Sequence, residues 1–319
     1  MSLPPILQNL EIPVIAAPLF IVSGPELVIA QCKAGIVGSF PALNARPKEE
    51  LEKWIIRIKL ELDQYQKENP DKKVAPFAVN QICHGSNNRL QHDMEVCVKH
   101  EVPIIITSLQ APKMIYDAVH SYGGIALHDV TNIRHTEKAL EVGADGIIAV
   151  CSGAGGHAGE MSPFALIPEI RSFFDGPLLC SGSISTGDSV LGALGIGADL
   201  AYIGTRFIAS KEANASEAYK DEIIESSGKD IVYSSLFTGV NGNYLRGSIE
   251  KAGLDPDNLE SAGKDSMNFG SGGNTDAKAW KDIWGAGQGV GTIDNKPSVQ
   301  EIVDQMKAEY ESARRRLLS

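Results

Sequence analysis

The sequence predicts an α/β protein, a (β/α)8 TIM barrel with a glycine-rich C-terminal appendage and a terminal helix. Eight short apolar segments alternate with amphipathic ones over roughly the first 210 residues, which is typical of repeated strand–helix units. The apolar segments are continuous runs, as expected of parallel strands covered on both faces. The alternative, a doubly wound open sheet, would need a G-x-G-x-x-G turn after an early strand. The glycine-rich loop at 153–159 follows the sixth strand and lacks that spacing.

The strands are bounded by proline and glycine. Pro18 ends the first, because proline cannot donate a hydrogen bond to a ladder. Gly-Ala-Asp triplets at 143–145 and 197–199 introduce two later strands, each with glycine at the end of the preceding helix. We expect strands at 13–19, 36–40, 77–81, 102–107, 124–129, 147–151, 177–183 and 198–205.

Helical periodicity marks the segments between the strands. Leu51, Ile55, Ile58 and Leu62 recur at helical spacing among charged residues. Ser23 and Glu26 have capping-box spacing, and Ser162 precedes a proline at the first position of another helix. We expect helices at 23–34, 51–65, 90–100 and 112–122. Three more are expected: one that ends at 142, one that begins at 162 and one near 185–188.

The pattern loosens after the eighth strand. We therefore divide the chain into a ligand-binding barrel, 1–210, and a helical and glycine-rich appendage, 211–319. The appendage holds a helix at 213–226, glycine- and asparagine-rich stretches at 238–247 and 268–291, and an amphipathic helix at 299–318. Long glycine-rich stretches form lids or stay disordered. Trp280, Ile283 and Trp284 favour folding back onto the barrel, as a lid closed by the last helix.

Composition argues against several classes of function. The net charge of −11 argues against a nucleic-acid partner. The five cysteines form no CxxC pair, and their odd number favours a reducing compartment without a disulfide framework. The N-terminus lacks the features of a signal peptide, and no apolar run approaches membrane-spanning length. We therefore expect a cytoplasmic protein with no membrane partner; a homodimer is left open.

Ligands of a barrel bind at the C-terminal ends of its strands. The residues at these ends include Asn80, Ser181-Gly182-Ser183 and Gly204-Thr205. The last two groups follow strands seven and eight, where barrels often hold a phosphate. Glycine frees backbone N–H groups to point at an anion. Each group alone could be a simple glycine turn, and their pairing on adjacent strands favours a phosphate site.

His157 lies in the stretch Gly153-Ala154-Gly155-Gly156-His157-Ala158-Gly159. Flanking glycines leave its imidazole little side-chain packing, which favours a role facing a substrate over a buried structural role. No second histidine or carboxylate stands at ligand spacing, so we expect no metal. The sequence also lacks a G-x-S-x-G elbow. His157 is therefore the candidate catalytic residue.

Several motifs, taken in order, resemble those of nitronate monooxygenases, formerly called 2-nitropropane dioxygenases. They are Ala17-Pro18-Leu19, Gly155-Gly156-His157-Ala158-Gly159, Ser181-Gly182-Ser183-Ile184, Gly204-Thr205-Arg206-Phe207 and Trp284-Gly285-Ala286-Gly287-Gln288-Gly289. The resemblance extends over nearly the whole chain and implies the cofactor FMN. FMN-dependent enoyl-acyl-carrier-protein reductases and some NADH:quinone reductases are similar in the same places.

The resemblance implies roles for single residues. The backbone of Ala17, Pro18 and Leu19 would line the flavin ring, and His157 would be the catalytic histidine. Gly182, Ser183, Gly204 and Thr205 would hold the FMN phosphate, with Ser181, Gly155 and Gly156 beside them. Asn80 and Gln288 are further candidate polar contacts. Relatives often have Met at position 19 and Gly at position 183. Some also place a lysine at the end of the fifth strand, where this chain has Asp129.

The reaction implied is oxidation of an alkyl nitronate, propionate 3-nitronate among the candidates, by O₂ to a carbonyl compound and nitrite. FMN would carry the electron chemistry, and His157 would stabilise the anion or remove the α-proton of a nitroalkane. Two alternatives stay open. One is an NAD(P)H-dependent FMN reductase acting on quinones or enoyl thioesters. The other is a flavin-binding protein without turnover.

Overall fold

The computed structural model describes residues 3–261 and 282–319. Eight parallel strands stand in the order β1-β9-β8-β6-β5-β4-β3-β2. A bridge between Ile15 of β1 and Val37, just before β2, joins the two ends of the sheet and closes the barrel. The predicted (β/α)8 barrel is confirmed. Its strands are β1 (Val14–Ala16), β2 (Gly38–Pro41), β3 (Phe77–Cys83), β4 (Ile104–Leu109), β5 (Ile125–Val130), β6 (Gly146–Val150), β8 (Leu178–Ser181) and β9 (Leu200–Ile203).

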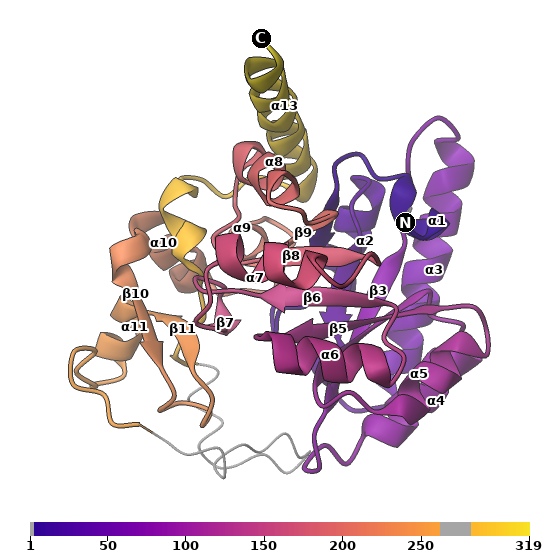
Figure 1. Cartoon of the computed structure of the whole chain (residues 1–319), viewed down its shortest axis with the longest axis horizontal. Coiled ribbons are helices and arrows are strands. Elements are labelled where there is room, and N and C mark those ends of the chain that lie inside the picture. The colour runs from indigo at the N-terminus through magenta and orange to yellow at the C-terminus, as the bar shows by residue number, and fades with distance from the viewer. Residues whose placement is uncertain (1–2, 262–281) are drawn as a thin grey trace.

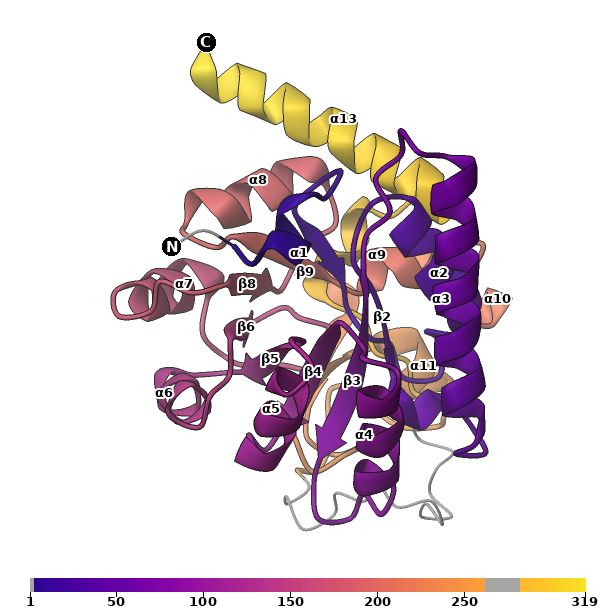
Figure 2. The same ribbon diagram turned by 90° about the vertical axis from the view of Figure 1, so that its right-hand side faces the viewer.

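Helices cover the outside of the barrel (Figures 1 and 2). The long helix α3 buries Leu51, Ile55, Ile58 and Leu62, the residues that predicted it. The bounds of the barrel helices are α1 (Pro5–Gln8), α2 (Pro25–Lys33), α3 (Glu50–Glu68), α4 (Leu90–Lys99), α5 (Lys113–His120), α6 (Ile133–Glu141), α7 (Pro163–Arg171), α8 (Gly187–Gly195) and α9 (Thr205–Ile208). A 3₁₀ turn, η1 (Ala42–Asn44), follows β2.

One predicted cap is wrong. The cap of α2 is Gly24, without a side-chain hydrogen bond, and the capping box of Ser23 and Glu26 does not form. The Ser23 hydroxyl instead accepts a hydrogen bond from the Leu19 N–H at 2.9 Å. The loop after β1 turns back on itself before the helix begins, so this serine stabilises the loop. Ser162 does occupy the N-cap position of α7, with Pro163 at the first helical position, but its side chain makes no capping hydrogen bond.

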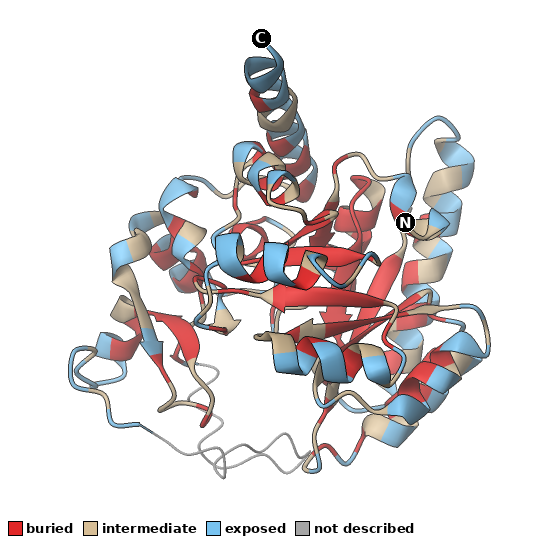
Figure 3. Cartoon of the chain, viewed as in Figure 1, coloured by how far each residue is buried: buried red, intermediate tan, exposed pale blue. Residues whose placement is uncertain are grey.

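Figure 3 shows the buried residues concentrated on the strands and on parts of the surrounding helices. Outward-facing strand residues pack against the helices. Inward-facing residues form a separate interior cluster that includes Ile15, Ile106, Leu127, Ile148 and Leu179. Side chains alternate along a strand, so the position two residues beyond each interior residue also faces inward. This rule identifies the side chains that reach the mouth of the barrel.

The appendage adds a second sheet beside the mouth (Figure 1). β7 (Gly156–His157), β10 (Ile231–Ser234) and β11 (Gly242–Leu245) pair antiparallel in the order β10-β11-β7. Trp284 stacks on Tyr219 with ring centroids 5.0 Å apart, and Ile283 is buried; Trp280 lies outside the described residues. The other appendage elements are α10 (Glu217–Glu225), η2 (Gly228–Asp230), α11 (Arg246–Lys251), η5 (Gln288–Thr292) and α13 (Val299–Leu318).

Candidate active site

The C-terminal mouth of the barrel is lined by polar side chains above an apolar interior. Ser108 and Asp129 lie two residues beyond the interior residues Ile106 and Leu127. The Ser108 hydroxyl donates to Asp129 Oδ2 at 2.5 Å. Asn80 donates through Nδ2 to Ser108 Oγ at 2.8 Å. Strands β3, β4 and β5 therefore bring the Asn80 amide, the Ser108 hydroxyl and the Asp129 carboxyl together at one rim of the barrel.

Four loops meet on the opposite side of the mouth, after β6, β8 and β9 and in the appendage. Gly182 has φ +129° and Ser183 has φ +57°, so this turn depends on left-handed backbone. Gly204, at the end of the neighbouring strand β9, likewise leaves room for a ligand to approach the backbone closely.

Close backbone approach explains the glycines of the loop after β6. A Cβ on Gly155 would lie 2.8 Å from the Gly287 nitrogen and 3.1 Å from Thr205 Oγ1. The Gly287 N–H donates to Thr205 Oγ1 at 2.9 Å, and the Gln288 N–H donates to the Gly153 carbonyl at 2.9 Å. We call this group of four loops the glycine cradle: Gly153–Gly155, Gly182–Ser183, Gly204–Thr205 and Gly287–Gln288.

His157 lies beside the glycine cradle, on β7. Its Nε2 is 2.8 Å from Thr238 Oγ1. Thr238 donates its own proton to the Val240 carbonyl at 3.0 Å, so the hydrogen bond to His157 is one that Nε2–H donates. These partners place the imidazole proton on Nε2 and make Nδ1 the unprotonated nitrogen. Burial lowers the pKa of His157 to about 4, so the ring is neutral near pH 7.

The predicted flavin-facing loop after β1 lies next to the cradle. Ala17, Pro18 and Leu19 are half-buried, and the Ala17 N–H donates to the Ile203 carbonyl at 2.8 Å. A Cβ on Gly204 would lie 3.1 Å from Leu19 Cδ2 and 3.6 Å from Ala17 Cβ. Gly204 therefore permits close contact between the ends of β1 and β9.

The remaining predicted residues differ in what they offer a ligand. Gln288 is exposed at the cradle, whereas Ser181 is buried at the end of β8. Asn80 is also buried, and its amide donates both to Ser108 Oγ and to the Ile106 carbonyl. Both amide protons of Asn80 are thus used inside the barrel, so a ligand would meet its Oδ1.

Two residues near this site were not predicted: Thr238 and Asn243. Asn243 Nδ2 donates to the Ala154 carbonyl at 2.6 Å, across a sequence separation of 89 residues. Thr238 and Asn243 lie in the glycine-rich stretch, whose pairing with β7 leaves no local pattern.

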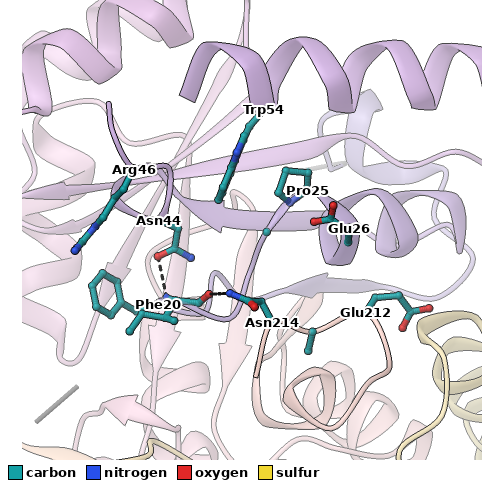
Figure 4. A pocket seen from close by; sticks show the side chains of 11 residues that line it. Phe20, Pro25, Glu26, Asn44, Arg46, Trp54, Glu212 and Asn214 are labelled. Atoms are coloured by element: carbon teal, nitrogen blue, oxygen red, sulfur yellow. Dashed lines mark hydrogen bonds between the residues drawn. The ribbon is translucent and has the colours of Figure 1, made fainter. Parts of the chain in front are cut away.

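A separate cavity of about 490 Å³ opens beside the barrel (Figure 4). Phe20, Asn44, Arg46, Trp54 and Asn214 are among its lining residues. Asn44 Oδ1 accepts from the Ile21 N–H, and Asn214 Nδ2 donates to the Ile21 carbonyl. None of the predicted site residues lines this cavity, so it is distinct from the candidate active site.

No described helix is both long and apolar enough to span a bilayer. In the described part of the chain, His, Cys, Asp and Glu side chains form no group of three that could hold a metal. A (β/α)8 barrel with glycine-rich loops and a neutral histidine at the C-terminal mouth, where such barrels bind their ligands, defines the class: a barrel enzyme.

Comparison with known proteins identifies the family of this chain. The sequence profile described as "Nitronate monooxygenase" matches residues 5–309. The chain belongs to the nitronate monooxygenase family and is an oxidoreductase. It is similar to a nitronate monooxygenase of Neurospora crassa, with 29% identity over 219 residues, 62% of this chain and 57% of that protein.

Two further relatives show how wide this similarity is. A (3aS,4S,5R,7aS)-5-hydroxy-7a-methyl-1-oxo-octahydro-1H-indene-4-carboxyl-CoA dehydrogenase of Rhodococcus jostii is 24% identical over 251 residues, 77% of this chain and 67% of that protein. The fold matches a nitroalkane oxidase from Streptomyces ansochromogenes with a TM-score of 0.79 and 21% identity, covering 98% and 100% of the two chains. The curated matches span between 51% and 67% of the relatives' own length.

Proposed function

We propose that this chain is an FMN-dependent nitronate monooxygenase. It oxidises alkyl nitronates, with propionate 3-nitronate as one candidate, using O₂ to give a carbonyl compound and nitrite. The observation that carries the proposal is the neutral His157 beside the glycine cradle, in a member of this family.

The residues of the cradle fit the phosphate of FMN. Gly182 and Gly204 end the adjacent strands β8 and β9, and Ser183 is exposed beside Gly182. A Cβ at Gly182 would lie 2.7 Å from the Ser152 carbonyl, so the turn requires glycine. Gly182, Ser183, Gly204 and Thr205 would hold the phosphate, and the Ala17–Leu19 backbone would line the ring. Bound there, the flavin supplies the electron transfer from nitronate to O₂.

His157 would act on the substrate through a hydrogen bond, because its neutral ring carries no charge near pH 7. A nitronate is already an anion and needs no base. With a neutral nitroalkane, the imidazole would accept the α-proton and leave the nitronate. Thr238 would keep the ring in one orientation throughout.

One observation favours a second candidate function. Asp129 places a carboxyl at the mouth, an unfavourable neighbour for an anionic substrate and a tolerable one for an uncharged quinone or enoyl thioester. The Rhodococcus relative carries the name of an acyl-CoA dehydrogenase. The second candidate is therefore an NAD(P)H-dependent FMN reductase.

Anaerobic stopped-flow spectroscopy of the FMN-loaded protein separates the candidates. The nitronate reaction predicts rapid bleaching of the flavin by ethyl nitronate and little response to NADH or NADPH. The reductase predicts the reverse. A protein that binds FMN and responds to neither would refute both and favour a flavin-binding protein without turnover. His157→Ala should abolish nitrite production; an unchanged kcat/KM would contradict the role of His157.

Two further expectations stay predictions from the sequence. They are a cytoplasmic location and assembly into a homodimer.

A further inference from the structure

Asp129 stands where the apolar interior of the barrel ends. Leu127, two residues earlier on β5, belongs to the interior cluster, and Asp129 continues the same inward face. Among the described inward-facing strand residues, Asp129 is the one that carries a carboxyl group. It is half-buried, surrounded by protein yet reached from the mouth.

The loop after β4 fixes the Asp129 carboxyl. Ser108 donates to it at 2.5 Å and is itself held by Asn80. The next residue, Leu109, has φ +75°, and the Gln110 N–H returns to the Ser108 carbonyl at 3.2 Å. This is a γ-turn of the rare, strained type. Its Leu109 N–H faces the carboxylate. Strain of this kind persists where the surrounding structure requires it, often at functional sites.

Among the described residues, the groups that set the pKa of Asp129 include no cation. Ser108 and Leu109 come from β4, and the charge of Asp129 also acts on Cys83 of β3, Tyr116 of α5 and Tyr202 of β9. Burial raises the pKa of Asp129 to about 6, against the two hydrogen bonds that lower it. Near pH 7 the carboxylate is therefore charged, and no described lysine or arginine is among the groups that set its pKa.

Tyr202 links this charge to the cradle. It lies two residues before Gly204 on the inward face of β9, and its pKa is raised in part by Asp129 across the barrel.

We propose that the Asp129 carboxylate tunes the substrate range by charge, lowering the affinity of the site for nitronate anions relative to neutral nitroalkanes. The inference rests on the proposed function and names the substrate class of the same site. Two unit charges some 7 Å apart at an effective dielectric constant of about 20 repel by roughly 2 kcal/mol, or more than about tenfold in affinity.

The first test uses sulfite, an anion that adds to bound flavins and bleaches them. The FMN-loaded wild type, Asp129→Asn and Glu160→Gln are titrated two pH units above the Asp129 pKa of about 6. Glu160→Gln removes the same charge from an exposed position near His157. Asp129→Asn should bind sulfite about tenfold more tightly or better, and Glu160→Gln should match the wild type. Equal sulfite affinity in the wild type and Asp129→Asn would overturn the proposal, whether or not nitronates are oxidised.

The second test needs no variant. In the wild type, the ratio of flavin-bleaching rates by ethyl nitronate and by nitroethane should fall as pH rises through about 6. A flat ratio would overturn the proposal even if Asp129→Asn failed to fold. Tighter sulfite binding in Asp129→Asn without bleaching by either nitro compound would refute the proposed function and support charge selection by Asp129.

Discussion

Thr238→Val tests whether the activity of His157 depends on its hydrogen bond to Thr238 of the appendage. The substitution keeps the shape of the side chain and removes the hydroxyl that lies 2.8 Å from Nε2 and 3.0 Å from the Val240 carbonyl. The Nε2–H is then left without this acceptor, which costs about 1–3 kcal/mol. The ring can then rotate or exchange tautomers. If this energy is lost in the transition state, kcat/KM for nitronate falls roughly 5- to 150-fold.

Initial rates of nitrite release, measured against substrate concentration, give kcat/KM for each variant. Thr238→Ser keeps the hydroxyl and should restore most of the activity. Tyr233→Phe removes another hydrogen bond on the same loop, from the Tyr233 hydroxyl to the Ala158 carbonyl at 3.1 Å, and should leave kcat/KM within about twofold. Thermal unfolding of each protein checks that the fold is intact. Equal kcat/KM in Thr238→Val and Thr238→Ser would refute the tautomer assignment.

Three further predictions concern the cradle, the rim and the appendage. Gly182→Ala puts a Cβ 2.7 Å from the Ser152 carbonyl, at a residue with φ +129°. The affinity for FMN, measured by quenching of flavin fluorescence, should fall more than about tenfold. Unchanged affinity would contradict the proposal that the glycine cradle binds FMN. Asp129 has a raised folded-state pKa of about 6, so it stabilises the fold most below its unfolded pKa and loses that effect as pH rises through 6. In denaturant titrations at high pH, Asp129→Asn should therefore be up to about 3 kcal/mol more stable than wild type. If the free energies of unfolding of the two proteins change in parallel with pH, the pKa of Asp129 is not raised. Asn243→Ala leaves the buried Ala154 carbonyl without its donor and should cost about 1–3 kcal/mol in the same titrations; no loss would show that water replaces the amide.

The barrel could be predicted because each of its strands is a local signal. Runs such as Ile104–Ile106 and Ile147–Ala149 are apolar on both faces, since one face meets the barrel interior and the other meets a helix. The order of strands and helices then determines which ends converge. This reasoning placed Gly182, Gly204 and His157 at one rim, and the structure brings them together there.

The second sheet could not be predicted, because its pairings carry almost no local information. β7 has two residues, and its partner β11 begins at Gly242, more than 80 positions later. Glycine at 156 and 242 gives no alternation of polar and apolar side chains. The hydrogen-bond partners of His157 and Ala154 follow from that register alone, which is why Thr238 and Asn243 were missed.

The role of the Asp129 charge at the rim also could not be predicted from the sequence alone. The sequence identified Asp129 as a departure from related proteins, and its place after β5 followed from the fold. What it does depends on Ser108, on the left-handed Leu109 and on the absence of a described cation among the groups that set its pKa. These are properties of three strand ends and one strained turn taken together.

The appendage contributes structure to the site as well as cover. Thr238 orients the imidazole of His157, Asn243 holds the Ala154 carbonyl, and the Gly287 N–H occupies Thr205 Oγ1. A Cβ on Gly287 would lie 2.5 Å from the Gly153 carbonyl, so this segment touches the loop after β6 directly. A rigid lid that opened as one body would break the contacts on His157 and on the cradle together. Substrate entry is therefore expected to leave β7–β11 paired, with any movement confined to segments that make none of these contacts.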